Sequence, residues 1–262
     1  MEVLKILSEY YGSYDEDQRL CSRHGSVEFL TTMRYIEKYL RPGMRVLEIG
    51  AATGRYSHTL ARKGYRVDAV ELVQHNIDIF KANTQPGEDV RIYQGNAKKL
   101  DMLSDETYDI TLLLGPMYHL FTVPEQLEAL SEAIRVTKKG GVVFSAYCGN
   151  EATMVQYCFG RGMIKEQRYR DLIDPVTFKA SSDPAELFEL YRKEDIDKLM
   201  AVFPVARLHY VGTDMATNYM RQTIDEMDDE MFNLYLRYHF AICERSDLVG
   251  ASHHMLDIFR KD

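Results

Sequence analysis

The chain has 262 residues, of which 45% are hydrophobic and 27% are charged, and its formal net charge at pH 7 is −8. This size and composition are typical of a globular protein with one large domain, or with one domain and an appendage. A protein that binds nucleic acid mainly through its phosphates usually carries the opposite charge, so the composition argues against that class.

The four cysteines show neither a CxxC pair nor the spacing of metal ligands; they are Cys21, Cys148, Cys158 and Cys243. We interpret them as reduced thiols of a cytosolic protein. The first 20 residues lack the basic segment followed by an apolar one that a secretory signal requires. No apolar run approaches the roughly 18 residues that cross a bilayer. We therefore expect a cytoplasmic protein that has no membrane segment.

Residues 1–43 have the periodicity of helices. In the segment VEFLTTMRYIEKYL, the apolar residues Val27, Ile36 and Leu40 recur near one face of a helix, and the dipeptide PG follows as a stop signal. We therefore predict a helical N-terminal segment before the first strand.

Between residues 44 and 147 the sequence alternates β-rich runs with amphipathic helical segments. Five runs are predicted as strands: 44–49, 65–72, 89–95, 108–115 and 142–147. Three segments between them are predicted as helices: 56–64, 74–83 and 125–141. Strands that alternate with helices in this way form βαβ units and a parallel sheet. The runs VLEI, ITLLL and VVFSA are almost continuously apolar, which is typical of strands covered on both faces.

The pattern is less regular from residue 148 onward. Residues 152–178 are predicted as a helical insertion with a loop, and further helices are predicted at 193–203 and 228–250. The β-rich segments 205–212 and 253–261 are predicted as two late strands.

The segment VLEIGAATG contains a glycine loop where the first strand ends. In a doubly wound sheet, ligands bind beyond the carboxyl ends of the strands, and glycines let a ligand approach the backbone closely. A phosphate-binding P-loop would need a second glycine at Arg55, and a dinucleotide-binding loop would need glycines at Ala52 and Arg55. The spacing therefore disfavours both of these ligand classes.

What remains is an acid, Glu48, followed by Gly50 and Gly54, which bracket three small residues. This arrangement resembles the first motif of the class I S-adenosylmethionine-dependent methyltransferases, an acid-x-G-x-G-x-G loop, with Ala52 in place of the middle glycine. Order and spacing extend the resemblance. Glu71 ends the second strand, QGNAKKL follows the third, YDITLLLGPMYHL resembles the fourth motif, and RVTKKGGVVFSAY resembles the segment that leads into the fifth strand.

The resemblance covers residues 44–147, and more broadly it is to the small-molecule methyltransferases that include the quinone-biosynthesis enzymes. It implies an α/β fold, a doubly wound Rossmann-like seven-stranded mixed sheet whose last two strands form an antiparallel hairpin. It further implies an N-terminal helical lid at residues 1–43 and a methyltransferase domain at 44–262. Residues from about 148 to 192 are expected to form a substrate-side helical insertion after the fifth strand.

The resemblance also implies S-adenosyl-L-methionine as the cofactor. On this basis Glu71 binds the two ribose hydroxyls, and Asn96, which replaces an acid, accepts a hydrogen bond from the adenine amino group. In the lid, Tyr14 presents an aromatic face that suits a sulfonium cation, and Arg19 is a candidate partner of the cofactor carboxylate. The full set of expected cofactor-binding residues is Glu48, Gly50, Ala51, Ala52, Gly54, Glu71, Leu72, Asn96, Ala97, Leu114, Gly115, Tyr14 and Arg19.

Each of these positions also has an ordinary structural interpretation. Glu48 would merely order its own loop, Glu71 would be a solvated charge at a strand end, and Asn96 would be a turn residue after Gly95. The position of Glu71 after the second strand favours ribose binding, whereas the two interpretations of Asn96 are about equally good.

The segment GPMYHL supplies the candidate catalytic residues, Tyr118 and His119. Pro116 interrupts a helix, so we expect the residues that follow it to lie on a loop at the mouth of the site. A histidine there can take a proton from a hydroxyl or amine of the acceptor, because its pKa lies near physiological pH. The alternative is that His119 only forms a hydrogen bond with the substrate or with the start of a helix.

The sequence thus predicts a methyltransferase that acts on a small-molecule acceptor, with no metal site, as a monomer or homodimer. The sulfonium makes the methyl group reactive, so the protein chiefly aligns the reactants and excludes water. Three alternatives stay open: a methyltransferase that acts on tRNA or protein, a nicotinamide-dependent oxidoreductase, and a cofactor-binding module without catalysis.

Overall fold

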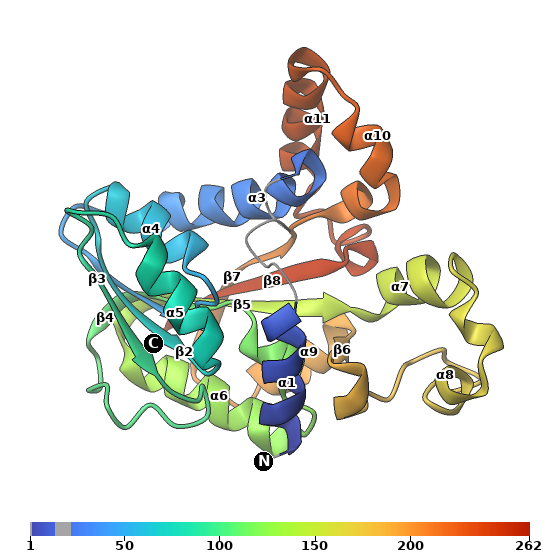
Figure 1. The fold of residues 1–262 in the computed structure, drawn as a ribbon, viewed down its shortest axis with the longest axis horizontal. Helices are drawn as coiled ribbons and strands as arrows, with labels where there is room; N and C mark the ends of the chain where they lie inside the picture. The colour runs from blue at the N-terminus through green and yellow to red at the C-terminus, as the bar shows by residue number, and fades with distance from the viewer. Residues whose placement is uncertain (1, 14–21) are drawn as a thin grey trace.

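The computed structural model describes residues 2–13 and 22–262, and its centre is one mixed β-sheet (Figure 1). Strand order across the sheet is β3-β2-β1-β4-β5-β8-β7. The bounds are β1 Arg45–Ile49, β2 Arg66–Glu71, β3 Val90–Gln94, β4 Tyr108–Leu113, β5 Thr137–Gly149, β7 Val205–Gly212 and β8 His254–Lys261. Strands β1 to β5 are parallel, and β8 runs antiparallel to both β5 and β7. The predicted doubly wound mixed sheet is therefore confirmed, and a short eighth strand pairs with β5 beside the seven.

Helices cover both faces of this sheet. On one face, α3 (Arg23–Tyr39) and α4 (Arg55–Arg62) pack apolar side chains such as Ile36 and Leu60 against the strands. On the other face, α6 (Val123–Val136) and α9 (Lys193–Met200) contribute side chains such as Leu130 and Leu199. In Figure 1, α3 and α4 lie above the sheet and α6 and α9 below it. The apolar strand runs of the sequence reflect this burial on both sides.

Three further groups of helical segments complete the fold. Helix α1 (Glu2–Ser13) stands in front of the sheet in Figure 1, and α5 (Gln74–Asn83) follows β2 and packs against it. The insertion after β5 holds short helical pieces: α7 Asn150–Thr153, a π-helix Met154–Phe159 and α8 Gln167–Asp171. The segment between β7 and β8 holds a 3₁₀-helix Met215–Met220, α10 Arg221–Asp225 and α11 Asp229–Ile242.

Several local predictions are wrong in ways that have physical reasons. The expected loop after Pro116 is a 3₁₀-helix, Pro116–His119, because a proline in the first helical turn loses no hydrogen bond. The expected helix 228–250 ends at Ile242, and a separate 3₁₀-helix follows at Val249–Ala251. A short strand that the sequence did not reveal, β6 (Leu190–Tyr191), pairs in parallel with the end of β5.

The strand register brings the expected site residues to one edge. Ile49 at the end of β1 pairs with Val70 on one side and with Leu113 on the other. The loops that follow β1, β2 and β4 therefore begin next to one another. No helix of the described residues has the length and apolar character that a membrane span requires.

Candidate functional site

A cavity of about 490 Å³ opens at this edge, and we call it the first cavity. It gathers the expected residues of four separate loops: Glu48, Gly50, Ala51, Ala52, Glu71, Leu72, Asn96, Ala97, Leu114, Gly115, Tyr118 and His119. Gly54 does not line it; this residue is the N-cap of α4, and its N–H donates to the carbonyl oxygen of Ala51 at 2.8 Å. The remaining two, Tyr14 and Arg19, lie outside the described residues.

The two glycines of the first loop are required by packing within the protein itself. Gly50 has a φ of +78°, and a Cβ there would lie 2.6 Å from Cδ of Pro116. Gly54 has a φ of +93°, and its Cβ would overlap the ring of Phe80. Any larger residue would therefore displace the loop.

Ala52 stands where the methyltransferase motif has its middle glycine, and it adopts a left-handed conformation with a φ of +46°. Such a conformation costs a non-glycine residue about 1 kcal/mol or more. A hydrogen bond holds it in place, because the N–H of Ala52 donates to Oε2 of Glu71 at 2.9 Å. The loop after β1 is thus tied to the acid at the end of β2.

Glu71 is buried and accepts further hydrogen bonds within its own loop. Its Oε1 accepts from the N–H of Val73 at 2.8 Å and from Nδ2 of Asn76 at 3.4 Å. Burial raises the pKa of this carboxyl, although these donors oppose the shift. Glu71 is therefore fixed in orientation at the wall of the first cavity rather than solvated.

Glu48 serves its own loop and also lines the first cavity. Its Oε2 accepts from the backbone N–H of Ser57 at 2.9 Å and from the hydroxyl of the same residue. These bonds hold the first turn of α4, where an acid also interacts favourably with the helix dipole. Burial raises the pKa of Glu48 to about 8, against the opposing effect of the Ser57 donors.

Asn96 is exposed at the rim of the first cavity. Its Oδ1 accepts the backbone N–H of Lys98 at 3.0 Å, so it forms the local turn that was one of its two interpretations. Nζ of Lys98 lies 2.6 Å from Glu125 at the start of α6. The amide oxygen has a second lone pair, which leaves room for one more donor.

His119 is held at both ring nitrogens. Its Nδ1 lies 2.8 Å from the carbonyl oxygen of Leu187, which can only accept, so Nδ1 carries the proton. Its Nε2 therefore accepts from the hydroxyl of Tyr11 on α1 at 2.9 Å. Burial lowers the pKa of His119, with the Leu187 bond as a smaller opposing effect. The ring is thus neutral near pH 7 and is already engaged on both sides.

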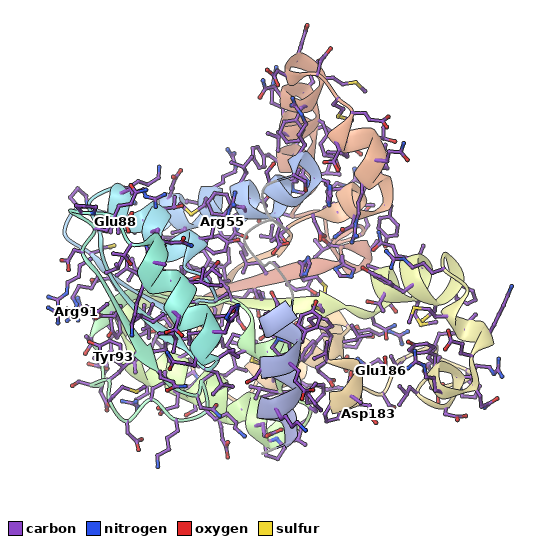
Figure 2. The ribbon with its side chains drawn as sticks, viewed as in Figure 1. Arg55, Glu88, Arg91, Tyr93, Asp183 and Glu186 are labelled. Atoms are coloured by element: carbon purple, nitrogen blue, oxygen red, sulfur yellow. The ribbon has the colours of Figure 1, made fainter. Side chains whose placement is uncertain are left out.

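A second cavity of about 650 Å³ adjoins the first. The two share part of their lining: Tyr11, Glu28, Tyr118 and His254. The second cavity is rich in aromatic side chains, namely Tyr10, Tyr11, Tyr118, Tyr157, Tyr169 and Phe188. In Figure 2, Arg55 of the first cavity lies above α1, and Asp183 and Glu186 of the second cavity lie to its right.

The shared wall contains a charged cluster that the sequence analysis missed. Nδ1 of His254 lies 2.8 Å from Oδ2 of Asp214 and 3.3 Å from Oε2 of Glu28. Burial alone would lower the pKa of His254, but Glu28 and Asp214 together raise it well above its ordinary value. Asp214 is buried, and burial alone would raise its pKa. The interactions with His254 and Ser252 outweigh burial and bring the pKa of Asp214 well below its ordinary value. The adjacent pair His253-His254 before the last strand was the available signal.

Comparisons with known proteins agree with the fold. A sequence profile of the family described as "Methyltransferase domain" matches residues 46–141. A ubiquinone biosynthesis O-methyltransferase of Hahella chejuensis is 22% identical over 74% of this chain and 81% of its own. A solved structure from Thermotoga maritima, described as a SAM-dependent methyltransferase and possible histamine N-methyltransferase, has a TM-score of 0.59 at 17% identity, covering 99% of this chain and 100% of its own. The CcbJ methyltransferase of Streptomyces caelestis has a TM-score of 0.60 at 16% identity, with coverages of 97% and 96%.

Proposed function

Since the chain is a class I S-adenosylmethionine-dependent methyltransferase, we propose that it methylates a small molecule held in the second cavity. The observation that supports this proposal is the pair of adjoining cavities, which share Tyr11, Glu28, Tyr118 and His254. A cofactor in the first cavity and an acceptor in the second would meet at that shared wall. The bound cofactor supplies a methyl group made reactive by its sulfonium, so the protein has to bind and align.

The residues of the first cavity fit this cofactor. Glu71 accepts hydrogen bonds from donors on Ala52, Val73 and Asn76, and the backbone N–H of Leu72 also interacts with its carboxylate. The bond from Asn76, at 3.4 Å, is longer than those from Ala52 and Val73, so a ribose hydroxyl can replace it. We assign ribose binding to Glu71, the adenine to Asn96 and Ala97, and the methionine end to the loops at Gly50–Ala52 and Leu114–Gly115.

The second cavity fits a small acceptor with a planar or aromatic part. A cavity of about 650 Å³ lies in the size range of sites for small organic molecules. Tyrosine rings such as Tyr157 and Tyr169 offer flat apolar faces together with hydroxyl groups that orient a polar ligand. The names of the Hahella relative and of a demethylmenaquinone methyltransferase from Lysinibacillus sphaericus, 28% identical over 43% of this chain, support an acceptor of this kind.

We assign His119 the task of holding the site closed. Its bonds to Tyr11 and Leu187 join α1 to the segment before β6, and they leave neither nitrogen available to take a proton from the acceptor. On this view α1 is part of the lid expected at residues 1–43, and closure keeps water from the reacting atoms.

The proposal is tested in two steps. Calorimetry with S-adenosylmethionine and with NADH should show binding of the former alone. A panel of small aromatic alcohols, acids and amines is then incubated with protein and cofactor, and mass spectrometry should detect a product in which one methyl replaces a hydrogen.

The variant Tyr169→Ala should impair transfer to that acceptor while leaving the cofactor dissociation constant unchanged. Tyr238→Ala, on the exposed face of α11, is the matched control and should change neither quantity. Methyl transfer to tRNA or to a protein side chain, with none to the panel, would replace the proposal with its macromolecular alternative.

A further inference from the structure

The wall between the two cavities gathers side chains that are common metal ligands. Asp214 follows β7 and His254 begins β8, and these strands are antiparallel neighbours whose register pairs Gly212 with Met255. The register therefore places Asp214 beside the His253-His254 pair. One potential ligand atom from each of these three residues lies within 4.8 Å of the other two.

Asp214 is fixed in place by donors on every side. Its Oδ1 accepts from the hydroxyl of Ser252 at 2.7 Å and from the N–H groups of His253 and His254 at 2.9 and 3.1 Å. Its Oδ2 accepts from Nδ1 of His254 at 2.8 Å and from Nδ2 of Asn218. A cation at Oδ2 would take the place of one of these two donors, while the donors to Oδ1 keep the carboxylate in orientation.

His253 supplies an independent observation. Its side chain lines the second cavity, and its Nδ1 is buried without a hydrogen-bond partner among the described residues. An unsatisfied buried nitrogen is destabilising, so each such atom calls for an explanation. A bound cation at this position would satisfy it.

The charges of the cluster also favour a bound cation. Two carboxylates, those of Glu28 and Asp214, lie 3.3 and 2.8 Å from the same nitrogen of His254. A divalent cation carries two positive charges and would suit a site flanked by two carboxylates.

We propose that Asp214, His253 and His254 bind a divalent transition-metal ion of the Zn²⁺ or Mn²⁺ type, with Glu28 as a fourth ligand. Two imidazoles with carboxylates suit such ions better than they suit Ca²⁺ or Mg²⁺, which prefer all-oxygen sites. Metal–ligand bonds of about 2.1 Å place the ligands of a tetrahedral site about 3.4 Å apart. The separations between potential ligand atoms, from 2.8 Å to at most 4.8 Å, bracket this value.

The location links the metal to the acceptor, an extension that rests on the proposed function. His254 and Glu28 line both cavities, whereas Asp214 and His253 line the second. A cation held there would face an acceptor hydroxyl beside the first cavity and lower the pKa of that hydroxyl.

Metal binding is tested without cofactor or acceptor, so its outcome is independent of the methyl-transfer assay. Protein treated with a chelator is titrated with Zn²⁺, Mn²⁺ and Mg²⁺ by calorimetry, and its metal content is measured after gel filtration. We expect one equivalent of Zn²⁺ or Mn²⁺ to bind and Mg²⁺ to bind far more weakly. His253→Gln should weaken Zn²⁺ binding by about tenfold or more, whereas His75→Gln, on the exposed surface of α5, should leave it unchanged.

His253→Gln removes no side-chain hydrogen bond that the structure records, so the variant is expected to fold, and circular dichroism checks this. His254→Gln is the second variant and should abolish binding. The proposal is overturned if the wild-type protein binds no stoichiometric Zn²⁺ or Mn²⁺, or if folded His253→Gln binds as the wild type does. The cluster would then be an imidazolium paired with two carboxylates.

Discussion

At the scale of single residues, Glu71 joins the two loops on which cofactor binding is expected to depend. Its Oε2 holds the left-handed Ala52 after β1, and its Oε1 holds the N–H of Val73 after β2. One side chain therefore shapes the loop that replaces a glycine-rich motif and also presents a carboxylate to the first cavity. The substitution of alanine for the motif's middle glycine is compatible with the fold because this bond offsets the backbone strain.

Two replacements of Glu71 should therefore distinguish the effect of its charge on cofactor binding from the effect of its side-chain volume. Glu71→Gln retains the side-chain volume but loses the charge-assisted bonds, and Glu71→Ala loses both. We expect Glu71→Gln to weaken S-adenosylmethionine binding by about 1–3 kcal/mol, because a hydrogen bond to a charged group contributes that much. Calorimetry measures the dissociation constant, and Glu128→Gln on the exposed face of α6 is the control. An unchanged constant in folded Glu71→Gln would remove Glu71 from the ribose site.

At the scale of elements, one histidine joins three segments that are distant in the chain. The ring of His119, in the 3₁₀-helix after β4, forms hydrogen bonds with Tyr11 on α1 and with the carbonyl of Leu187 before β6. It also packs against the ring of Phe188, with centroids 5.4 Å apart. This junction is a direct contact between α1 and the centre of the site, and Leu7 of α1 also lines the first cavity.

The junction predicts different outcomes for closure and for base catalysis. Tyr11→Phe removes the donor to Nε2 of His119 but retains the ring. If His119 closes the site, the KM for the cofactor should rise by roughly two- to tenfold, the value of one net hydrogen bond, with little change in kcat. Tyr238→Phe is the control on an exposed helix. If His119 were the base, Tyr11→Phe would free Nε2, and kcat would rise or stay unchanged while KM stayed constant.

Elements formed by local patterns could be predicted from the sequence, and elements formed by tertiary contacts could not. The predicted helix 74–83 and strand 205–212 have the observed bounds. Periodicity and spacing also predicted which loops line the first cavity, because the carboxyl ends of parallel strands meet at one edge of the sheet. Strand β6 is too short to show alternation and exists because it pairs with the end of β5. The cluster of Asp214 with His253 and His254 depends on the register of β7 and β8, which no local pattern encodes.

At the scale of the whole molecule, burial of acids at the sheet edge couples folding to pH. Glu48 is 2% exposed, and burial raises its pKa to about 8 from an ordinary value of 4.5. Between those two values the folded state holds a proton that the unfolded state releases. The contribution of Glu48 to stability is therefore present below about pH 4.5 and is lost as the pH rises toward 8. Other groups titrate as well: burial lowers the pKa of His239 and of His253 to about 4, and these groups act in the opposite direction.

A comparison of the wild type with Glu48→Gln isolates this contribution, because the other groups are common to both proteins. Urea unfolding without cofactor is measured at about pH 5, 6.5 and 8. The difference in the free energy of unfolding should shift in favour of Glu48→Gln as the pH rises, by up to about 1.4 kcal/mol per pH unit. The glutamine also retains an oxygen that accepts the Ser57 N–H. Any difference in the free energy of unfolding that does not vary with pH therefore reports the hydrogen bonds alone. A difference that stays constant from pH 5 to 8 would mean that Glu48 titrates at its ordinary pKa, and that it enters the site as a permanent anion beside Glu71.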